Sequence, residues 1–378
     1  MTLAVLPYPS PGILRSTLAE WSVAYDLATE STHILSPEAG WVLDLCDGES
    51  STEGLVAEIA AISGGPADDV AADVHAYLEM LSEIGLVSSR DVLATPVVPE
   101  STIAVDRAGP YASAGLRVLT TGVVIQSNDA ALLAQAEALV ASLRASVPIT
   151  MTIGMEAHPG GGVTLTGWGP ACSYPSPAEA LDALPPLLRS IATHAHDCLV
   201  LRSGCVRSPA GEVVLLPGPP GSGATTLAAA LVRLGWDYAS DAIVGLQSGP
   251  TVALAYPAPL ALSDESRRIL RLDPSPSSAT KVTDVRADVT ILFGPVGPVE
   301  RVIIAFFQPG ARLHLEMLDP ASAAGALLEH ALNLTEIGNQ GLDIVCDLAQ
   351  HVPVLGLVHS DINEAVAAVN DSSPRPGP

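Results

Sequence analysis

A strand, a glycine-rich turn and a helix are predicted in succession between residues 213 and 232, and their spacing points to phosphate chemistry. An apolar β-rich run at 213–216 precedes the turn, and an Ala/Leu-rich run follows it. Gly218, Gly223 and Thr225 match the phosphate-loop pattern G-x-x-x-x-G-K-[ST]. Such a loop converges backbone N–H groups on an anion at the positive end of a helix. The predicted nucleotide-binding residues are Gly218, Gly221, Ser222, Gly223, Ala224, Thr225 and Thr226.

The loop departs from the pattern at one position, because Ala224 stands where the lysine belongs. That lysine meets the β- and γ-phosphates and follows the negative charge as the phosphoryl group leaves. The only lysine in the chain, Lys281, lies well downstream, so a replacement cation has to be that residue or an arginine. Two interpretations stay open: the loop holds nucleotide through its backbone, or it is a glycine- and proline-rich turn that binds no phosphate.

An acidic residue follows the loop at the spacing of a magnesium-side carboxylate. The run 236–246 reads as a strand, an acidic break at Asp241 and a second strand. In a phosphate-loop protein, an acid at such a strand end lies near Mg²⁺, and the hydroxyl at the helix start is its partner. Asp241 and Thr225 are therefore the predicted metal ligands if nucleotide binds. The alternative role of Asp241 is to cap a turn.

Composition and net charge indicate which classes of binding partner to expect. The chain has 378 residues, 48% of them hydrophobic, which is enough for two or three packed domains. Its formal net charge of −24 repels nucleic-acid phosphates and anionic membranes, so we expect neither as a partner. The sequence opens without a signal-peptide pattern and contains no apolar run long enough to span a bilayer. These features predict a cytoplasmic protein.

The cysteines and histidines show no metal-ligand spacing. The cysteines are Cys46, Cys172, Cys198, Cys205 and Cys346. Their number is odd and no C-x-x-C pair occurs, so free buried thiols in a reducing compartment are predicted. His194 and His196 close a predicted helix over 177–196 but lack a third partner at metal spacing. Surface or capping roles are expected for both.

The first 90 residues predict a small winged-helix-like module. The expected strands cover 21–26 and 31–35 as a hairpin, and the expected helices cover about 37–46, 52–63 and 68–84. Ser36 and Pro37 supply an N-cap and a first-turn proline for the first helix. The third helix carries apolar residues at helical spacing and ends at Gly85.

Three segments of this module, Ser36–Trp41, Cys46–Glu49 and Val70–Val87, resemble the PqqD family. That family is the leader-peptide-binding module (RiPP recognition element) of ribosomally made, post-translationally modified peptides. The resemblance implies that an extended leader peptide adds as a strand to the sheet edge and lies against the third helix. The peptide site that it implies consists of Thr32, His33, Ile34, Leu35, Asp69, Asp73, Ala76, Tyr77 and Met80. The carboxylates in this set favour a leader with basic residues.

A winged helix can also bind DNA, but the charge of the third helix argues against that alternative. Asp68, Asp69, Asp73 and Glu79 would face phosphates with the wrong sign. Ordinary packing is the alternative role of His33 and Tyr77.

The rest of the chain predicts one linker, a lobe, a loop domain and a tail. The expected bounds are 1–90 for the module, 91–108 for the linker, 109–198 for an α+β lobe, 199–370 for the phosphate-loop domain and 371–378 for a disordered tail. Strands at 301–307 and 312–316 are expected to pair, and a helix to follow over 320–334. The predicted fold class is therefore α/β (α+β): a winged-helix-like module joined to a phosphate-loop domain with a preceding α+β lobe.

The region from about 116 to 369 resembles the HPr kinase/phosphorylase superfamily, especially bacterial kinases found beside or fused to PqqD-like modules. Such kinases typically show a histidine in the strand before the loop, the loop lysine, and an acidic pair after the next strand. At these positions this chain has Arg202, Ala224 and the pair Asp241-Ala242. Three catalytic positions therefore depart from the superfamily pattern.

These departures predict a pseudokinase. Removing one preorganised charge contact raises a barrier by about 3–4 kcal/mol, and removing an acid–base partner slows a reaction by about 10²–10⁴-fold. Arg202 can approach phosphates, but an arginine cannot act as a general base. No cofactor is required in this interpretation, with ATP and Mg²⁺ as optional ligands.

The sequence thus predicts a precursor-peptide-binding protein that scaffolds the peptide or presents it to modifying enzymes of the same pathway. The superfamily resemblance also implies self-association. One alternative is an active ATP-dependent kinase of the peptide or of a small molecule, using Asp241, Arg202 and Lys281. The other is a nucleotide sensor that binds without turnover.

Overall fold

The computed structural model describes residues 6–88, 109–274 and 279–372, which belong to two compact units, Met1–Val98 and Pro99–Pro378. The predicted linker at 91–108 lies outside the described residues, and so do residues 373–378 of the predicted tail. Asp371, expected to begin that tail, is instead the last residue of a helix. Among the described residues, we find no helix that is both long enough and apolar enough to cross a bilayer.

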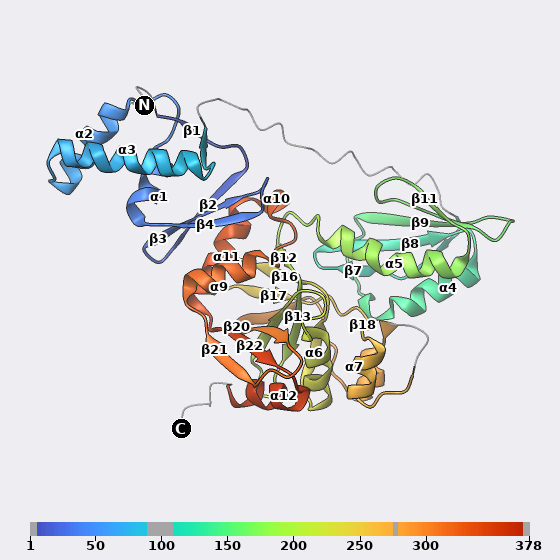
Figure 1. Cartoon of the computed structure of the whole chain (residues 1–378). Coiled ribbons are helices and arrows are strands. Elements are labelled where there is room, and N and C mark those ends of the chain that lie inside the picture. Colours follow the sequence, from blue (N-terminus) through green and yellow to red (C-terminus); the bar gives the residue numbers. More distant parts are fainter. Residues whose placement is uncertain (1–5, 89–108, 275–278, 373–378) are drawn as a thin grey trace. The chain divides into compact units, whose positions relative to one another are not determined.

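The first unit contains an antiparallel sheet in the order β2-β3-β4, formed by Ile13–Leu18, Trp21–Asp26 and Ser31–Leu35 (Figure 1). The predicted hairpin of β3 and β4 is confirmed, with Val23 opposite Ile34. β2 was not predicted, because only its first two residues form an apolar run; pairing with β3 supplies the rest of the strand. β1 (Tyr8–Pro9) pairs with β5 (Val87–Ser88). Within the described residues β4 pairs with β3 alone, so it is an edge strand.

The three predicted helices of this unit are present as α1 (Pro37–Asp44), α2 (Thr52–Ser63) and α3 (Ala67–Glu83). The side chain of Ser36 caps α1 by accepting a hydrogen bond from Ala39 N, and Gly64 ends α2 in the left-handed conformation. The buried face of α3 packs into a core with β3, β4 and α1, whose members include Ala24, Leu35, Val42, Leu43, Val70, Val74, Leu78 and Leu81.

The second unit begins with a mixed sheet in the order β11-β10-β9-β8-β6, to which β7 adds by pairing with β8. Its strands are β6 (Tyr111–Ala112), β7 (Leu116–Val118), β8 (Thr121–Ser127), β9 (Met151–Ala157), β10 (Val163–Thr166) and β11 (Cys172–Tyr174). The accompanying helices are α4 (Ala130–Leu139), the 3-10 turn η1 (Ala141–Leu143) and α5 (Pro177–Ala192).

A larger mixed sheet holds the phosphate-loop segment, in the order β12-β16-β17-β20-β14-β13-β15, with β22 on β20 and β21 on β22. Its strands are β12 (Leu199–Leu201), β13 (Ser203–Arg207), β14 (Val213–Pro217), β15 (Asp237–Ser240), β16 (Val244–Gln247), β17 (Val252–Leu254), β20 (Pro295–Phe307), β21 (His314–Met317) and β22 (Val354–His359). A separate short pair joins β18 (Leu260–Ala261) to β19 (Ala279–Thr280). β14, β20 and β22 are parallel neighbours.

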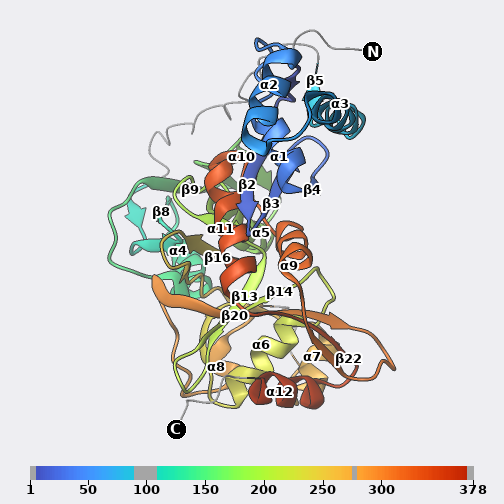
Figure 2. The ribbon, with the colours of Figure 1, turned by 90° about the vertical axis from the view of Figure 1, so that its left-hand side faces the viewer.

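Helices cover both faces of the parallel strands. Figure 2 shows β14, β20 and β22 between α9 and α11 on one side and α6 and α12 on the other. The helices are α6 (Ala224–Arg233), α7 (Asp264–Ile269), α8 (Val282–Val285), α9 (Pro320–Leu328), α10 (Leu334–Ile337), α11 (Asn339–His351) and α12 (Ile362–Asp371). The helix expected over 320–334 therefore ends at Leu328, and α11 was not predicted.

The expected pairing of the strands near 301–307 and 312–316 is wrong. β21 pairs with β22, and β22 lies between β21 and β20. Chain order favoured a hairpin, but the chain returns from α11 and inserts β22 parallel to β20, where both faces of the strand are covered.

The α+β lobe and the larger sheet share one hydrophobic core. Lobe residues such as Val123, Ile125 and Leu184 pack in the same cluster as residues from beyond the loop. The latter are Ile243, Leu254, Tyr256 and Ala258. Residues 99–378 accordingly form one compact unit, and its division at 198 stays a prediction.

The cysteines are free, but they are not all buried. Cys172 is exposed, because it lies on the outermost strand of the lobe sheet, and this corrects the expectation for that residue. Burial raises the pKa of the Cys46, Cys198 and Cys205 thiols to about 12. These three thiols are therefore held in their unreactive protonated form at neutral pH.

Candidate functional site

The phosphate-loop segment folds in the predicted order of strand, turn and helix. β14 ends at Pro217, residues 218–223 form the turn, and α6 begins at Ala224. Gly221 and Gly223 have φ angles of +87° and +88°, a region that glycine occupies without strain. A side chain at Gly218 would collide with Ser222. The sequence of the turn therefore matches the backbone that it adopts.

Hydrogen bonds hold the turn against the sheet. Ser222 N donates to Pro219 O at 3.0 Å, and Phe307 N, at the end of β20, donates to Ser222 O at 2.8 Å. The hydroxyl of Ser222 accepts a longer bond from Ala224 N, at 3.4 Å. These contacts fix the turn at the carboxyl ends of the parallel strands, where open α/β sheets bind ligands.

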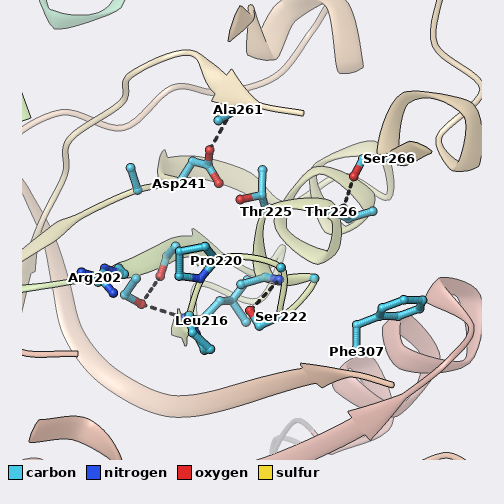
Figure 3. A pocket seen from close by; sticks show the side chains of 18 of the residues that line it. Arg202, Leu216, Pro220, Ser222, Thr225, Thr226, Asp241, Ala261, Ser266 and Phe307 are labelled. Atoms are coloured by element: carbon cyan, nitrogen blue, oxygen red, sulfur yellow. Dashed lines mark hydrogen bonds between the residues drawn. The ribbon is translucent and has the colours of Figure 1, made fainter. Parts of the chain in front are cut away.

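The turn forms one wall of a cavity of about 810 Å³ (Figure 3). All of the predicted nucleotide-binding residues line it, together with Arg202 and Asp241. The structure therefore brings together loop, strand and acidic residues that are up to 39 positions apart, from Arg202 to Asp241. Lys281 is not among the lining residues; it is exposed at the start of α8. It therefore does not supply the missing loop charge.

Asp241 lies at the end of β15 with only one of its carboxylate oxygens occupied. Oδ2 accepts a hydrogen bond from Ala261 N at 3.0 Å, and Oδ1 is buried without a hydrogen-bond partner among the described residues. Burial raises the pKa of this carboxyl, while the Ala261 N–H, the Thr225 hydroxyl and the charge of Arg189 lower it. In Figure 3, Asp241 and Thr225 lie on neighbouring parts of the cavity wall with their oxygens toward one another.

These two oxygens fit the magnesium side of a nucleotide site. A hard cation prefers carboxylate and hydroxyl oxygens, and it would offset the desolvated charge of Asp241. Among the described residues, no three His, Cys, Asp or Glu side chains gather closely enough to hold a metal ion by themselves. Magnesium at this place would therefore depend on phosphate oxygens for the rest of its coordination.

Two further groups in the cavity wall were missed from the sequence. Arg189 projects from α5 and acts on Asp241, and His359 ends β22 beside the loop. Arg189 follows the buried Leu188 in the helix that was predicted over 177–196. His359 lies within the region that resembles the HPr kinase superfamily, but none of the quoted motif positions includes it. No local motif marks either residue, because their meeting depends on sheet order.

Two side chains that the kinase pattern uses for phosphoryl transfer are missing from the cavity wall. Ala224 brings no charge to the loop, and Arg202, at the position of the expected histidine, has no proton-accepting atom. Asp241 remains as the one lining carboxylate beside the loop helix. Glu265, the other acidic lining residue, is exposed and pairs with Arg268 on α7.

In the first unit, the predicted peptide-binding residues lie on an edge strand and on one helix face. Thr32, His33 and Ile34 are partly or largely exposed on β4, whereas the side chain of Leu35 is 4% exposed and belongs to the core. Leu35 can therefore contribute its backbone only, because its side chain is packed. The α3 residues follow helical spacing, and they are Asp69, Asp73, Ala76, Tyr77 and Met80.

The α3 residues differ in exposure. Asp69, Asp73 and Ala76 are exposed, and Tyr77 and Met80 are half-buried against the core. α1 packs against both α3 and β4, so it links the two predicted parts of the peptide site. α3 contains five acidic side chains and no lysine or arginine, which keeps its exposed face negative.

Comparison with known proteins gives a family match in the first unit and a weak likeness to a solved structure. Residues 22–87 match the family model for Coenzyme PQQ synthesis protein D (PqqD). No curated protein matches the chain significantly. Among solved structures, the Hpr(Ser) kinase/phosphatase from Coxiella burnetii is similar with a TM-score of 0.27 and 8% identity, over 46% of this chain and 90% of that one. That overlap is too weak to place individual residues on one another. The chain therefore carries a PqqD domain at residues 22–87, followed by a mixed α/β unit with a phosphate-loop-like turn.

Proposed function

We propose that the protein binds the leader of a ribosomal precursor peptide through its PqqD domain and presents it to modifying enzymes. The observation that carries this proposal is the PqqD match over a unit whose sheet ends in the edge strand β4. An edge strand offers a row of unpaired backbone N–H and C=O groups to an extended peptide. Affinity then comes from backbone hydrogen bonds, and selectivity comes from the side chains beside the edge.

The side chains of α3 favour a basic leader. Asp69 and Asp73 are exposed one helical turn apart, so a peptide lying along this face meets two carboxylates. Such charges steer association and reject acidic peptides more than they add affinity. Tyr77 and Met80 offer apolar surface for one or two anchoring side chains.

In our proposal the second unit binds nucleotide without transferring phosphate. Backbone N–H groups of the turn and the N-terminus of α6 would hold the phosphates, and Thr225 with Asp241 would hold Mg²⁺. Magnesium would neutralise phosphate charge there. The absence of a loop lysine and of a base at Arg202 supports a scaffolding role.

Calorimetric titration of the full chain with the precursor peptide encoded beside its gene tests the peptide half. We expect micromolar or tighter binding, and slowed amide exchange at residues 31–35 in the complex. A scrambled peptide of the same composition is the control, since it keeps the charge and loses the order. Absence of heat at high micromolar peptide, or equal binding of the scrambled peptide, would contradict the proposal.

An active kinase is the second candidate, favoured by the unpartnered Oδ1 of Asp241 within the cavity. Incubation with labelled ATP, Mg²⁺ and peptide separates the two. We expect no labelled peptide and no accumulation of ADP, while ATP raises the melting temperature. Phosphate transfer that Asp241→Asn abolishes would establish the kinase instead.

A further inference from the structure

The carboxyl ends of three parallel strands lie at the phosphate turn, and the last of these strands ends in a histidine. β14 leads into the turn, β20 ends at Phe307 and β22 ends at His359, with Phe307 and His359 in register. Phe307 N is bonded to Ser222 O, and Gln308 N donates to His359 O at 2.9 Å. Sheet topology therefore fixes His359 beside the turn, although it lies 136 residues after Gly223.

The imidazole lies directly against the start of α6. A β-carbon built on Gly223 would be 3.3 Å from His359 Nε2 and 3.5 Å from Cε1. His359 is 2% exposed and lines the cavity, and its ring meets the Phe307 ring edge-on at a centroid distance of 5.7 Å. Any side chain at Gly223 would crowd this ring, so the glycine leaves room for the imidazole at the helix N-terminus.

The ring nitrogens of His359 have no hydrogen-bond partner among the described residues. The backbone of Asp361 favours the charged ring, but no hydrogen bond of ordinary geometry joins the two. Buried polar atoms are nearly always bonded, and an exception calls for a missing partner. A histidine against the positive end of a helix is suited to an anionic partner, which would bond both the ring and the backbone N–H groups.

Few charged groups surround the ring. Asp361 and Glu364 begin α12, and His314 pairs with Glu316 on the exposed strand β21. The first turn of α6, residues 224–226, is uncharged. Across the cavity lie Asp241, Arg189 and Arg202. Burial lowers the pKa of His359, and Asp361 acts in the opposite direction.

We propose that His359 takes the place of the missing loop lysine: its imidazole contacts a phosphoryl group held at the N-terminus of α6 and gains a proton when that group binds. This inference rests on the nucleotide binding proposed above and names the side chain that completes it. A lysine keeps its charge in the empty site, whereas His359 acquires charge with its ligand. The loop would then bind phosphate in a pH-dependent way.

The sign of that dependence follows from linkage. The free ring is kept neutral by burial, and the bound anion favours the protonated ring, so the pKa rises on binding. Affinity is therefore highest at low pH and falls as pH rises between the two pKa values. Each unit of difference between them gives about a tenfold change in affinity.

The test is titration of the full chain with Mg-ATP at pH 6.0 and pH 8.0, each in two buffers of different ionisation enthalpy. The wild type should take up protons on binding and lose about tenfold affinity at pH 8.0. His359→Gln keeps a hydrogen-bonding amide and removes the titration. It should bind about tenfold more weakly at pH 6.0. Comparing the two proteins cancels the titration of ATP itself.

A second titration distinguishes a failure of the proposed role of His359 from a failure of nucleotide binding. Adding Ala224→Lys to His359→Gln should restore binding at both pH values, which shows that the variant is folded and its loop intact. Equal proton uptake and affinity in wild type and His359→Gln would overturn the role of His359 and leave nucleotide binding standing. Absence of ATP binding by the wild type at both pH values would overturn the nucleotide half of the proposed function and this inference with it.

Discussion

The two candidate sites both use backbone groups as their main donors, but they differ in what surrounds those groups. β4 offers a strand edge in the same unit as the acidic helix α3, whereas the turn of residues 218–223 offers N–H groups in a cavity that Arg189 and Arg202 also line. In our proposal the first surroundings favour cationic ligands and the second favour anionic ones. Backbone geometry can therefore persist in both units while side chains set the sign of the ligand.

This difference also shows how far a net charge can mislead. The formal charge of −24 argues against extended polyanions as partners, but it does not describe a cavity with two arginines and one buried carboxylate in its wall. A small phosphate ligand would meet this local arrangement and not the net charge of the chain. The predictions below test whether the two sites have opposite preferences.

Reversing the charge of the α3 face should have the largest effect. Asp69→Lys/Asp73→Lys should weaken binding of a basic leader peptide roughly thirtyfold at low salt, because two attractions become repulsions. Calorimetric titration measures the change. Glu53→Lys/Glu58→Lys on α2 makes the same change in charge, also includes a first-turn acid, and should leave affinity nearly unaltered. Equal losses in both variants would mean that α3 has no special role.

Restoring the loop lysine should have the next largest effect. Ala224→Lys should tighten ATP binding about tenfold, since it adds a charge-assisted contact to phosphate. We expect no turnover, because the superfamily's histidine is still missing at residue 202. Ala224→Gln adds similar length without charge and is the matched control. If both substitutions act alike, the loop does not contact phosphate.

A smaller effect is expected from removing the hydroxyl of Thr225, which we propose as a ligand of Mg²⁺. Thr225→Val preserves the shape of the side chain and removes its oxygen, so Mg²⁺ should improve ATP binding several-fold less than in the wild type. Titrations with and without Mg²⁺ give this ratio. Thr226→Val is the control, because its hydroxyl is 2.7 Å from Ser266 Oγ and faces that partner. An unchanged magnesium effect in Thr225→Val would place the cation elsewhere.

The smallest effect concerns stability. The pKa of Asp241 is raised in the folded protein, so its carboxyl adds to the free energy of unfolding when it is protonated. This stabilisation is fully present below the unfolded-state pKa and is lost as pH rises through the folded-state pKa. At neutral pH the charged form therefore weakens the fold, and Asp241→Asn should raise Tm by about 2–4 °C, the shift given by about 1 kcal/mol. Thermal melts at pH 4 and pH 7.5 should show a gain that shrinks at the lower pH. A lower Tm at pH 7.5 would show that the charge is well satisfied.

The local parts of the fold could be read from the sequence, because local signals determine them. Ser36 and Gly64 mark helix ends, and Gly218 and Gly223 mark the turn, so these segments have the predicted structure. The order of strands in the larger sheet could not be read. Insertion of β22 between β20 and β21 depends on long-range pairing, which no local signal in the sequence reports.

The residues of the candidate sites were likewise predictable only where a local signal marks them. The residues of the phosphate turn and Asp241 were predicted, because motif spacing reports them, and the structure gathers them around one cavity. Arg189 and His359 were not predicted, since each reaches the cavity through the packing of a distant element. Leu35 was assigned to the peptide site because the PqqD resemblance implied it, and its burial shows that such a resemblance does not say which face a side chain occupies.

The shared core of the second unit limits how this protein can be rearranged in evolution. A recombination breakpoint at residue 198 would separate Val123 and Leu184 from Tyr256 and Ala258. Both fragments would then expose apolar surface that the shared core buries. Gene exchange can therefore swap the PqqD domain as a module, whereas the phosphate turn must travel with the whole of its unit.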